Sequence, residues 1–290
     1  MAQIFTRLLR ESQITVLESG ATEPDLLIVP PNGALLDTYQ YPGLLREQLM
    51  READLPLVIF PSSSRFTSMD PASIFGTRKS PVLWMLREPY SFHHLRTKWA
   101  GSLERANVTL VLDHDVVASG HHYVPEVFAG CAPDVFHPLL VARLGAEASV
   151  LPDTLPTLKR HRRMFVRAYQ YLPDGRVKLA LRRRITRSRQ ILANRQLLEV
   201  PGLSTAEQEA LAARVGIARD ISDPQLTTRS EYLESIAGAS LVLTNRLHVA
   251  LPAAALGKET LLVDSGYHKL RGVYEHSLSS VPNIKLLSRG

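Results

Sequence analysis

Residues 239–264, ASLVLTNRLHVALPAAALGKETLLVD, carry the clearest fold signal in the chain. The apolar run at 241–243 predicts a strand, and residues 247–256 predict a helix that ends at Gly257. The run at 260–264 predicts a second strand. A strand, a helix and a strand in close succession form the unit from which parallel sheets are built. This stretch therefore predicts an α/β fold.

The same alternation extends in both directions along the chain. Strands are predicted at 26–29, 57–60, 82–86, 108–112 and 164–167, and helices at 41–53, 182–196, 205–215 and 232–237. Ser91 is expected to cap a helix that runs to about residue 100. Residues 129–156, rich in proline and glycine, suggest a crossing between domains. We expect two Rossmann-like domains, 1–150 and 151–290, with parallel sheets that face a cleft.

Composition excludes several classes of protein. The chain has 290 residues, of which 45% are hydrophobic and 21% charged, so it is neither disordered nor fibrous. Its single cysteine, Cys131, cannot form an intrachain disulfide, which favours a reducing compartment. No apolar run approaches the roughly 20 residues of a membrane helix, and the N-terminal residues do not resemble a signal peptide. We expect a cytoplasmic protein.

Positive charge is concentrated in one region. Between Lys159 and Arg189 there are twelve lysine and arginine residues and one acidic residue, Asp174. Such a run is either a solvated face or a contact with an anionic partner. No helix-turn-helix, zinc-finger or RNA-binding pattern accompanies it, so we do not expect nucleic acid. Apolar residues interleave with the arginines, which favours peripheral contact with the acidic inner face of the cell membrane. Charge reversal at Arg182, Arg183 and Arg184 would test this.

The junction Thr244-Asn245-Arg246-Leu247-His248 combines three features of an anion site. It lies where a helix begins, and helix N-termini attract anions. Arg246 adds a planar fork that suits carboxylate or phosphate, and His248 can exchange a proton near neutral pH. Lys269, on a later loop, could close over the same anion. In the alternative interpretation, Arg246 pairs with a surface acid and His248 is an ordinary helix residue.

The run 239–258, together with Asp264, Tyr267-His268-Lys269, Gly272 and Tyr274-Glu275, resembles the C-terminal signature of polysaccharide pyruvyl transferases. The resemblance is specific over residues 230–278. It implies an enzyme that moves the enolpyruvyl group of phosphoenolpyruvate onto two hydroxyls of a sugar, forms a pyruvate ketal and releases phosphate. It also implies a two-domain fold similar to that of GT-B glycosyltransferases.

Weaker similarities to the family occur earlier in the chain. They are Pro61-x-Ser63, Arg87-Glu88-x-x-Ser91, the strand-end Asp113 and the strand-end Arg167. The family's glycine-rich GGGN-x-GD loop is replaced here by PPNGALLD at residues 30–37, in which Asn32, Gly33 and Asp37 match. The resemblance is therefore closer on the donor side than on the acceptor side.

These matches assign roles to individual residues. His248 and Arg246 are the expected catalytic pair, and Glu88 and Asp113 are the candidate bases for a sugar hydroxyl. The expected substrate-binding residues are Arg167, Asn245, Lys269, Ser63, Arg87 and Tyr267. No cofactor is expected, since phosphoenolpyruvate is itself the donor substrate. The expected acceptor is a free or lipid-linked glycan precursor for exopolysaccharide or another cell-surface glycan.

Two other functions stay open. A GT-B glycosyltransferase would use the Arg246 and His248 site to grip the diphosphate of a nucleotide sugar. A catalytically inactive relative would bind sugar or act as a scaffold. Asp113-His114-Asp115 with His121-His122 could form a metal site, but the spacing matches no specific ligand pattern and we expect no metal.

Overall fold

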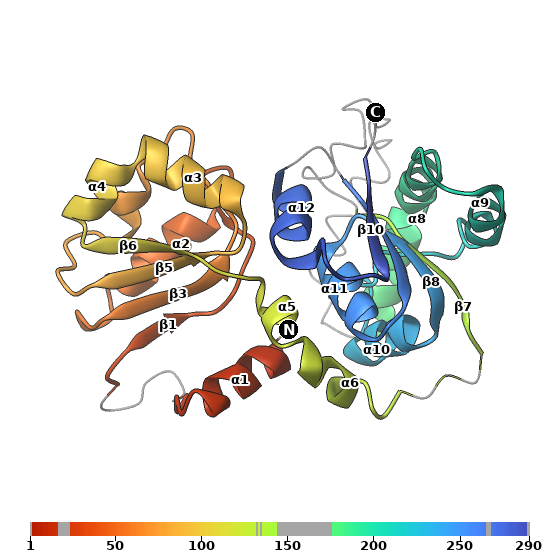
Figure 1. Cartoon of the computed structure of the whole chain (residues 1–290), viewed down its shortest axis with the longest axis horizontal. Helices are drawn as coiled ribbons and strands as arrows, with labels where there is room; N and C mark the ends of the chain where they lie inside the picture. Colours follow the sequence, from red (N-terminus) through yellow and green to blue (C-terminus); the bar gives the residue numbers. More distant parts are fainter. Residues whose placement is uncertain are drawn as a thin grey trace. The chain divides into compact units, whose positions relative to one another are not determined.

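The computed structural model describes residues 2–16, 24–131, 133, 135–143, 176–264 and 268–288. The chain divides into two compact units (Figure 1). The first unit contains Met1–Tyr123 and Arg271–Ser280, and the second contains Val124–Leu270 and Val281–Gly290. The division therefore falls well before residue 150, the expected boundary, and a late segment of the chain returns to the first unit.

Four parallel strands form the sheet of the first unit, in the same order in space as along the chain. They are β1 (Leu27–Val29), β3 (Leu57–Ser62), β5 (Val82–Leu86) and β6 (Val108–Leu112). Two short strands, β2 (Leu35–Leu36) and β4 (Ser64–Arg65), pair separately. The helices of this unit are α1 (Ala2–Glu11), α2 (Tyr41–Leu49), η1 (Pro71–Ile74), α3 (Pro89–Lys98), α4 (Ala100–Arg105), α5 (Val116–Ser119) and η2 (His121–Tyr123).

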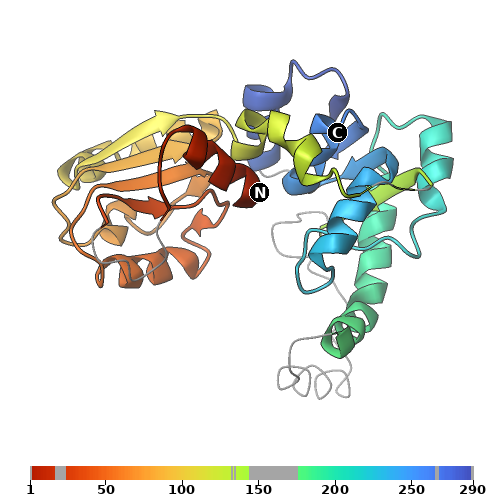
Figure 2. The same ribbon diagram turned by 90° about the horizontal axis from the view of Figure 1, so that it is seen from below.

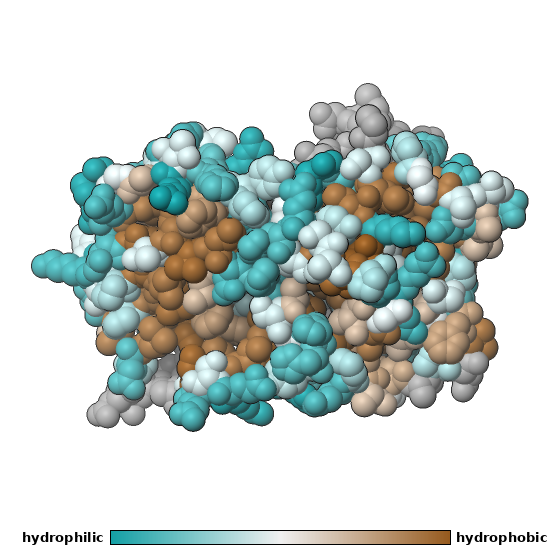
Figure 3. Space-filling model, viewed as in Figure 1, coloured by the Kyte–Doolittle hydropathy of each residue, from teal (hydrophilic) through white to brown (hydrophobic). Residues whose placement is uncertain are grey.

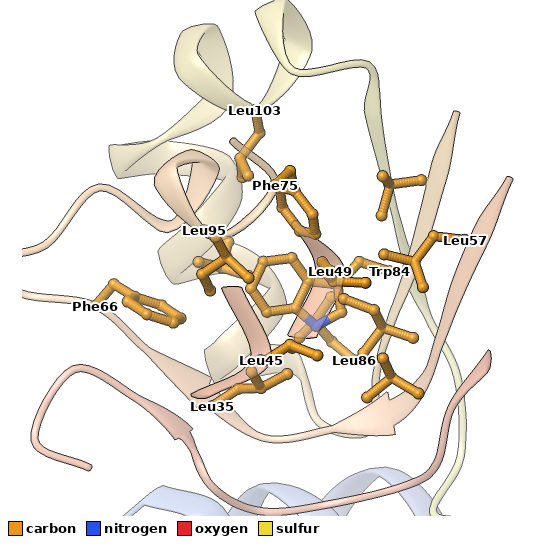
Figure 4. Packing of buried hydrophobic residues seen from close by; sticks show 14 residues of the cluster. Leu35, Leu45, Leu49, Leu57, Phe66, Phe75, Trp84, Leu86, Leu95 and Leu103 are labelled. Carbon is orange, nitrogen blue, oxygen red and sulfur yellow. The ribbon is translucent and has the colours of Figure 1, made fainter. Parts of the chain in front are cut away.

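One face of the first sheet carries the core of its unit. Side chains alternate between the two faces of a strand, and on β5 Val82, Trp84 and Leu86 are at most 1% exposed. Helices α2, η1, α3 and α4 contribute side chains to the same cluster. Figure 4 shows Trp84 among these side chains, with the rings of Phe66 and Phe75 at centroid distances of 6.1 and 5.9 Å.

The opposite face of the first sheet is only partly covered. Strand register places Ile28, Val58, Leu83 and Thr109 in one row across this face, and Met85 and Val111 in the next. Each of these side chains is half-buried or exposed. Helix α1 covers one end, where the ring of Phe5 meets Phe60 edge-on at 4.6 Å. Apolar side chains gather on the surface of this unit in Figure 3.

The second sheet is buried more completely. Its parallel strands are β7 (His137–Val141), β8 (Ala239–Thr244), β9 (Glu259–Val263) and β10 (Ile284–Leu287), again in chain order. In β8 every residue except Ser240 is buried, and in β9 every residue except Glu259. The helices are α6 (Val124–Val127), α8 (Arg176–Leu198), α9 (Thr205–Ala212), α10 (Arg229–Ala237), α11 (Leu247–Ala255) and α12 (His268–Val273). The predicted α/β fold with parallel, Rossmann-like sheets is thus confirmed.

Three local expectations need correction. The stretch 129–156 is not simply a crossing, because β7 lies within it and pairs with β8. Helix α8 begins at Arg176, six residues before the predicted start. The N-cap of α3 is Glu88 rather than Ser91, since the Glu88 carboxylate accepts the Ser91 N–H. The expected strand at 164–167 lies outside the described residues.

The returning segment Arg271–Ser280 contains the end of α12 and a π-helical turn, η3 (Tyr274–Leu278).

Within the described ranges, no helix is both long enough and apolar enough to span a lipid bilayer. The arrangement of the two units about a cleft stays a prediction.

Candidate functional site

In each sheet, an arginine that follows a strand is bonded to a buried aspartate. In the first unit this residue is Arg87, after β5. Its Nη1 lies 2.8 Å from Oδ2 of Asp115, and its Nε donates to Ser63 Oγ at 2.8 Å. The side chains of Arg87 and Asp115 are 1% and 2% exposed. The buried Nη2 of Arg87 has no hydrogen-bond partner among the described residues.

Glu88 is the most strongly perturbed acid at this edge. The residue is fully buried, and burial raises the pKa of its carboxyl group to about 7. Hydrogen bonds from Ser91 and the charge of Arg87 lower the pKa but do not offset burial. One carboxylate oxygen accepts the backbone N–H of Ser91 at 2.8 Å, and the other is bonded to its hydroxyl. Glu88 therefore exchanges its proton in the neutral range while its own helix holds it in place.

The returning segment Arg271–Ser280 covers Glu88 and its neighbours. A Cβ atom at Gly272 would lie 2.9 Å from Glu88 Cβ, so only glycine permits this approach without a shift. Tyr90 Oη donates to Glu275 Oε2 at 3.2 Å. A π-helical turn such as η3 is uncommon and often marks a functional position. The returning segment is thus part of the strand-end cluster of the first unit.

The same segment meets the end of β6. His114 and His276 stack at a ring distance of 4.4 Å, and His114 Nδ1 lies 3.0 Å from Ser277 Oγ. Burial and the nearby His114 lower the pKa of His276. Asp113 is half-buried, and its Oδ1 accepts the N–H of His114 at 2.7 Å. Asp113 is therefore less enclosed than Glu88, and it is Asp115 rather than Asp113 that pairs with Arg87.

In the second unit the corresponding arginine is Arg246. Its Nε donates to Asp220 Oδ2 at 2.8 Å, and its Nη2 is bonded to the same oxygen. Asp220 is 1% exposed, but the Arg246 side chain remains 19% exposed. No hydrogen bond joins Arg246 Nη1 to a described residue. The arginine is thus held by a buried acid and still reaches the surface.

Asn245 and His248 flank this arginine. Asn245 is 3% exposed, and its Oδ1 accepts the N–H of Arg143 at 2.7 Å, which ties the end of β7 to the end of β8. His248 is half-buried, and its backbone carbonyl accepts the hydroxyl of Tyr232. Burial raises the pKa of Tyr232, so this hydroxyl remains a donor. These bonds fix the first turn of α11.

Helix α11 begins without a capping side chain. Its N-cap is Arg246, whose side chain makes no cap hydrogen bond, while the Arg246 N–H donates to Thr244 Oγ1 at 2.9 Å. Helices α9 and α10 of the same unit each carry a complete capping box, Ser204 with Glu207 and Thr228 with Glu231. The first N–H groups of a helix attract anions, and this attraction is available where no side chain occupies the position. Strand β9 ends beside β8 in the sheet, and it is followed by two buried charged residues, Asp264 and Lys269.

The residues predicted from sequence thus fall into two groups. Ser63, Arg87 and Glu88 lie together in the first unit, and Asn245, Arg246 and His248 lie together in the second. Arg167 and Tyr267 lie outside the described residues. Sequence reasoning missed Asp220, the partner of Arg246, and the part of Asp115 in holding Arg87. The only signal for Asp220 is the polar turn Asp220-Ile221-Ser222-Asp223, which does not reveal its partner.

No three His, Cys, Asp or Glu side chains in the described part of the chain are grouped so as to hold a metal ion.

No protein-family model matches the sequence, and no curated protein matches it. A solved structure of an uncharacterized protein from Klebsiella pneumoniae subsp. pneumoniae NTUH-K2044 is similar, with a TM-score of 0.53 and 15% sequence identity. The match covers 98% of this chain and 85% of that one. At this identity the likeness concerns the fold alone.

Proposed function

We propose that this protein is a ketal-forming pyruvyl transferase that uses phosphoenolpyruvate as donor and a sugar of a cell-surface glycan precursor as acceptor. The observation that carries the proposal is the start of α11. There a partly exposed arginine, held by a buried aspartate, occupies the N-cap of a helix, and its side chain makes no cap hydrogen bond. Phosphoenolpyruvate carries a phosphate and a carboxylate, and this arrangement suits such a doubly anionic ligand.

In the proposed reaction each residue of the second unit has a role. Arg246 and the first turn of α11 bind the anionic groups of the donor, and Lys269 adds a second cation. His248 protonates C3 of the enol phosphate while the first sugar hydroxyl attacks C2. The second hydroxyl then attacks C2 as the C2–O bond to phosphate breaks, and its proton passes to the leaving phosphate, so that hydrogen phosphate leaves and the ketal remains. The protein supplies fixed charges that stabilise the charge developing on the leaving group.

The base for the sugar hydroxyl is assigned to the first unit. Of the two candidates, Asp113 is half-buried, and its carboxylate accepts the N–H of His114 within the same turn. Glu88 is fully buried, bonded to Ser91 and covered by Gly272. We therefore assign the base role to Asp113 and give Glu88 a positioning role. Ser63 and Arg87 are bonded to each other at the same strand ends as Glu88, and we therefore assign the sugar acceptor to this part of the first unit.

A thermal-shift titration tests the donor. A ligand at about 100 times its Kd adds roughly 2.7 kcal/mol to the free energy of unfolding, which raises Tm by several degrees. We expect this shift with phosphoenolpyruvate, a smaller one with inorganic phosphate, and none in Arg246→Ala. Arg246→Lys should give an intermediate shift because it keeps the charge but loses the fork. Each variant is compared with its own ligand-free Tm.

Arg229→Ala is the matched control, since Arg229 is an exposed arginine of the same unit. It should retain the full shift. A shift that persists in Arg246→Ala would overturn the assignment of the donor site. A shift with a nucleotide diphosphate sugar, but not with phosphoenolpyruvate, would favour the glycosyltransferase. Binding of phosphoenolpyruvate without ketal formation on any glycan acceptor would point to an inactive relative.

A further inference from the structure

Helix α8 is the most basic element in the described part of the chain. Its sequence, RVKLALRRRITRSRQILANRQLL, contains eight basic residues and no acidic residue. It also has no aromatic residue. In Figure 2 it is the long green helix at one side of the second unit. The structure separates its arginines into two groups that the sequence does not distinguish.

The side chains of the first group are bonded to other residues of the second unit. Arg183 Nη2 lies 2.6 Å from Glu231 Oε2, and its Nε donates to the carbonyl of Leu226 at 2.6 Å. Arg182 Nη2 lies 3.7 Å from Asp223 Oδ2. These two arginines attach α8 to the segment around α10. Reversing their charge would therefore disturb the fold as well as the surface, so the variant suggested by the sequence cannot isolate an effect on partner binding.

The second group faces outward. Arg184, Arg187, Arg189 and Arg195 are exposed, and no ion pair or hydrogen bond joins their side chains to a described residue. Arg184, Arg187 and Arg195 are spaced by three and eight residues, so they share one side of the helix over about 17 Å. Leu192, which is 39% exposed, lies beside them. We call Arg184, Arg187, Arg195 and Leu192 the arginine stripe.

We propose that the arginine stripe docks the protein on an anionic phospholipid surface. Three like charges along one line of a helix that has no acidic residue repel one another, and a partner that presents many negative groups over the same length relieves this repulsion. A bilayer surface offers this, because its anionic headgroups attract basic side chains that lie close to it. The inference stands independently of the proposed transferase activity.

Two features favour lipid over nucleic acid. An exposed leucine beside the arginines can enter the boundary between headgroups and acyl chains, as in helices that lie on membranes. Nucleic-acid surfaces, in contrast, commonly add aromatic side chains on which bases stack, and α8 has none. The part of the basic run between Lys159 and Arg176 lies outside the described residues and is not needed for this proposal.

Vesicle co-sedimentation of the full chain tests the proposal. We expect binding to vesicles in which about a third of the phosphatidylcholine is replaced by phosphatidylglycerol, none to phosphatidylcholine alone, and weakening as salt is raised. The triple variant Arg184→Glu, Arg187→Glu and Arg195→Glu should bind at least tenfold more weakly. The matched control is Arg46→Glu, Arg51→Glu and Arg105→Glu, which makes the same charge change at exposed arginines of the first unit and should bind as the parent does.

Each other outcome overturns the proposal. These are no binding by the parent protein, equal loss in the stripe and control variants, or stripe-dependent binding to a homopolymeric RNA but not to vesicles. Because the stripe faces away from its own unit, the triple variant should keep the parent's thermal unfolding and its Tm shift with phosphoenolpyruvate. If that shift is absent from both proteins while vesicle binding behaves as expected, the transferase assignment fails and the docking surface stands.

Discussion

The two sheets have the same topology but differ in what covers them. Each has four parallel strands in chain order, and each carries an arginine beyond a strand end that is bonded to a buried aspartate. The first sheet buries one face, whereas the strands β8 and β9 of the second are buried on both. At the strand ends it is the first unit that is more enclosed. Arg87 is buried and the side chain of Glu88 caps the helix that follows it, whereas Arg246 reaches the surface and its side chain does not cap its helix.

This difference shows how one local pattern can take two functions. Where the helix supplies its own carboxylate, the positive end of its dipole is neutralised from within and the arginine becomes part of the core. Where the helix has no such carboxylate, the positive end of its dipole can bind an anion that is not part of the protein. We therefore propose that the donor binds at the second edge.

The largest expected effect on the free energy of unfolding comes from removing the charge of Asp115, and the same change at Asp220 provides the comparison. Asp115→Asn leaves the guanidinium of Arg87 buried without a counter-charge, and it should cost roughly 3–5 kcal/mol of unfolding free energy. Asp220→Asn should cost only about 1 kcal/mol, since Arg246 is 19% exposed and can be hydrated. Urea unfolding followed by tryptophan fluorescence reports the first variant, because Trp84 and Trp99 both lie in the first unit. Far-UV circular dichroism reports the second.

The two asparagine variants are matched, because each aspartate also accepts a backbone N–H that asparagine can still accept. Adding Arg87→Met to Asp115→Asn should recover part of the loss, since the buried guanidinium is then removed as well. Equal costs for the two single variants would mean that Arg87 and Arg246 do not differ in their access to water.

A second effect is the pH dependence of the first unit. The folded pKa of Glu88 is about 7, above its ordinary value of 4.5, so the unfolded state releases this proton first as pH rises. Stability should therefore fall between about pH 5 and pH 7 and level off above that, by up to about 3 kcal/mol in total. Glu88→Gln should not show this fall. Tryptophan-detected urea unfolding at a series of pH values measures it.

The difference between parent and Glu88→Gln is the quantity to compare. His276, whose pKa is lowered, binds a proton more weakly in the folded state, so it makes stability rise through part of the same range. That contribution is present in both proteins and cancels in the difference. If the free energy of unfolding changes with pH in the same way in parent and variant, Glu88 has an ordinary pKa in the folded protein. The two strand-end sites would then not differ in this respect.

Sequence patterns predicted the sheets well because short apolar runs report burial directly. Strands at 82–86 and 108–112 were placed at their observed bounds. Strand β7 was missed because His137-Pro138 and the surrounding glycine and proline residues hide a run of only three buried residues. The start of α8 was placed too late because Val177, Leu179 and Leu181 alternate with a period of two, which does not indicate a helix.

The site was predictable only in part. Asn245, Arg246 and His248 adjoin one strand end, so their proximity follows from the local sequence. Asp220 lies 26 residues from Arg246 and bonds to it through a tertiary contact, for which no periodic signal exists. The approach of Gly272 to Glu88 is equally long-range. Ion pairs and close backbone contacts of this kind depend on the folded arrangement of segments, which a pattern of apolar residues does not encode.

The smallest expected effect concerns the partly covered face of the first sheet. Val111→Thr replaces a methyl group by a hydroxyl at a side chain that is 37% exposed, and it should change the free energy of unfolding by no more than about 0.5 kcal/mol. Val242→Thr makes the same exchange at a side chain that is 0% exposed, and it should cost about 1–3 kcal/mol, because the hydroxyl loses water. Both residues lie in strands and threonine is equally β-branched, so backbone preference cancels in the comparison. Urea unfolding measures both, by tryptophan fluorescence for Val111→Thr and by far-UV circular dichroism for Val242→Thr. A cost for Val111→Thr as large as that for Val242→Thr would show that another surface covers this face in solution, and the contrast between the two sheets would then disappear.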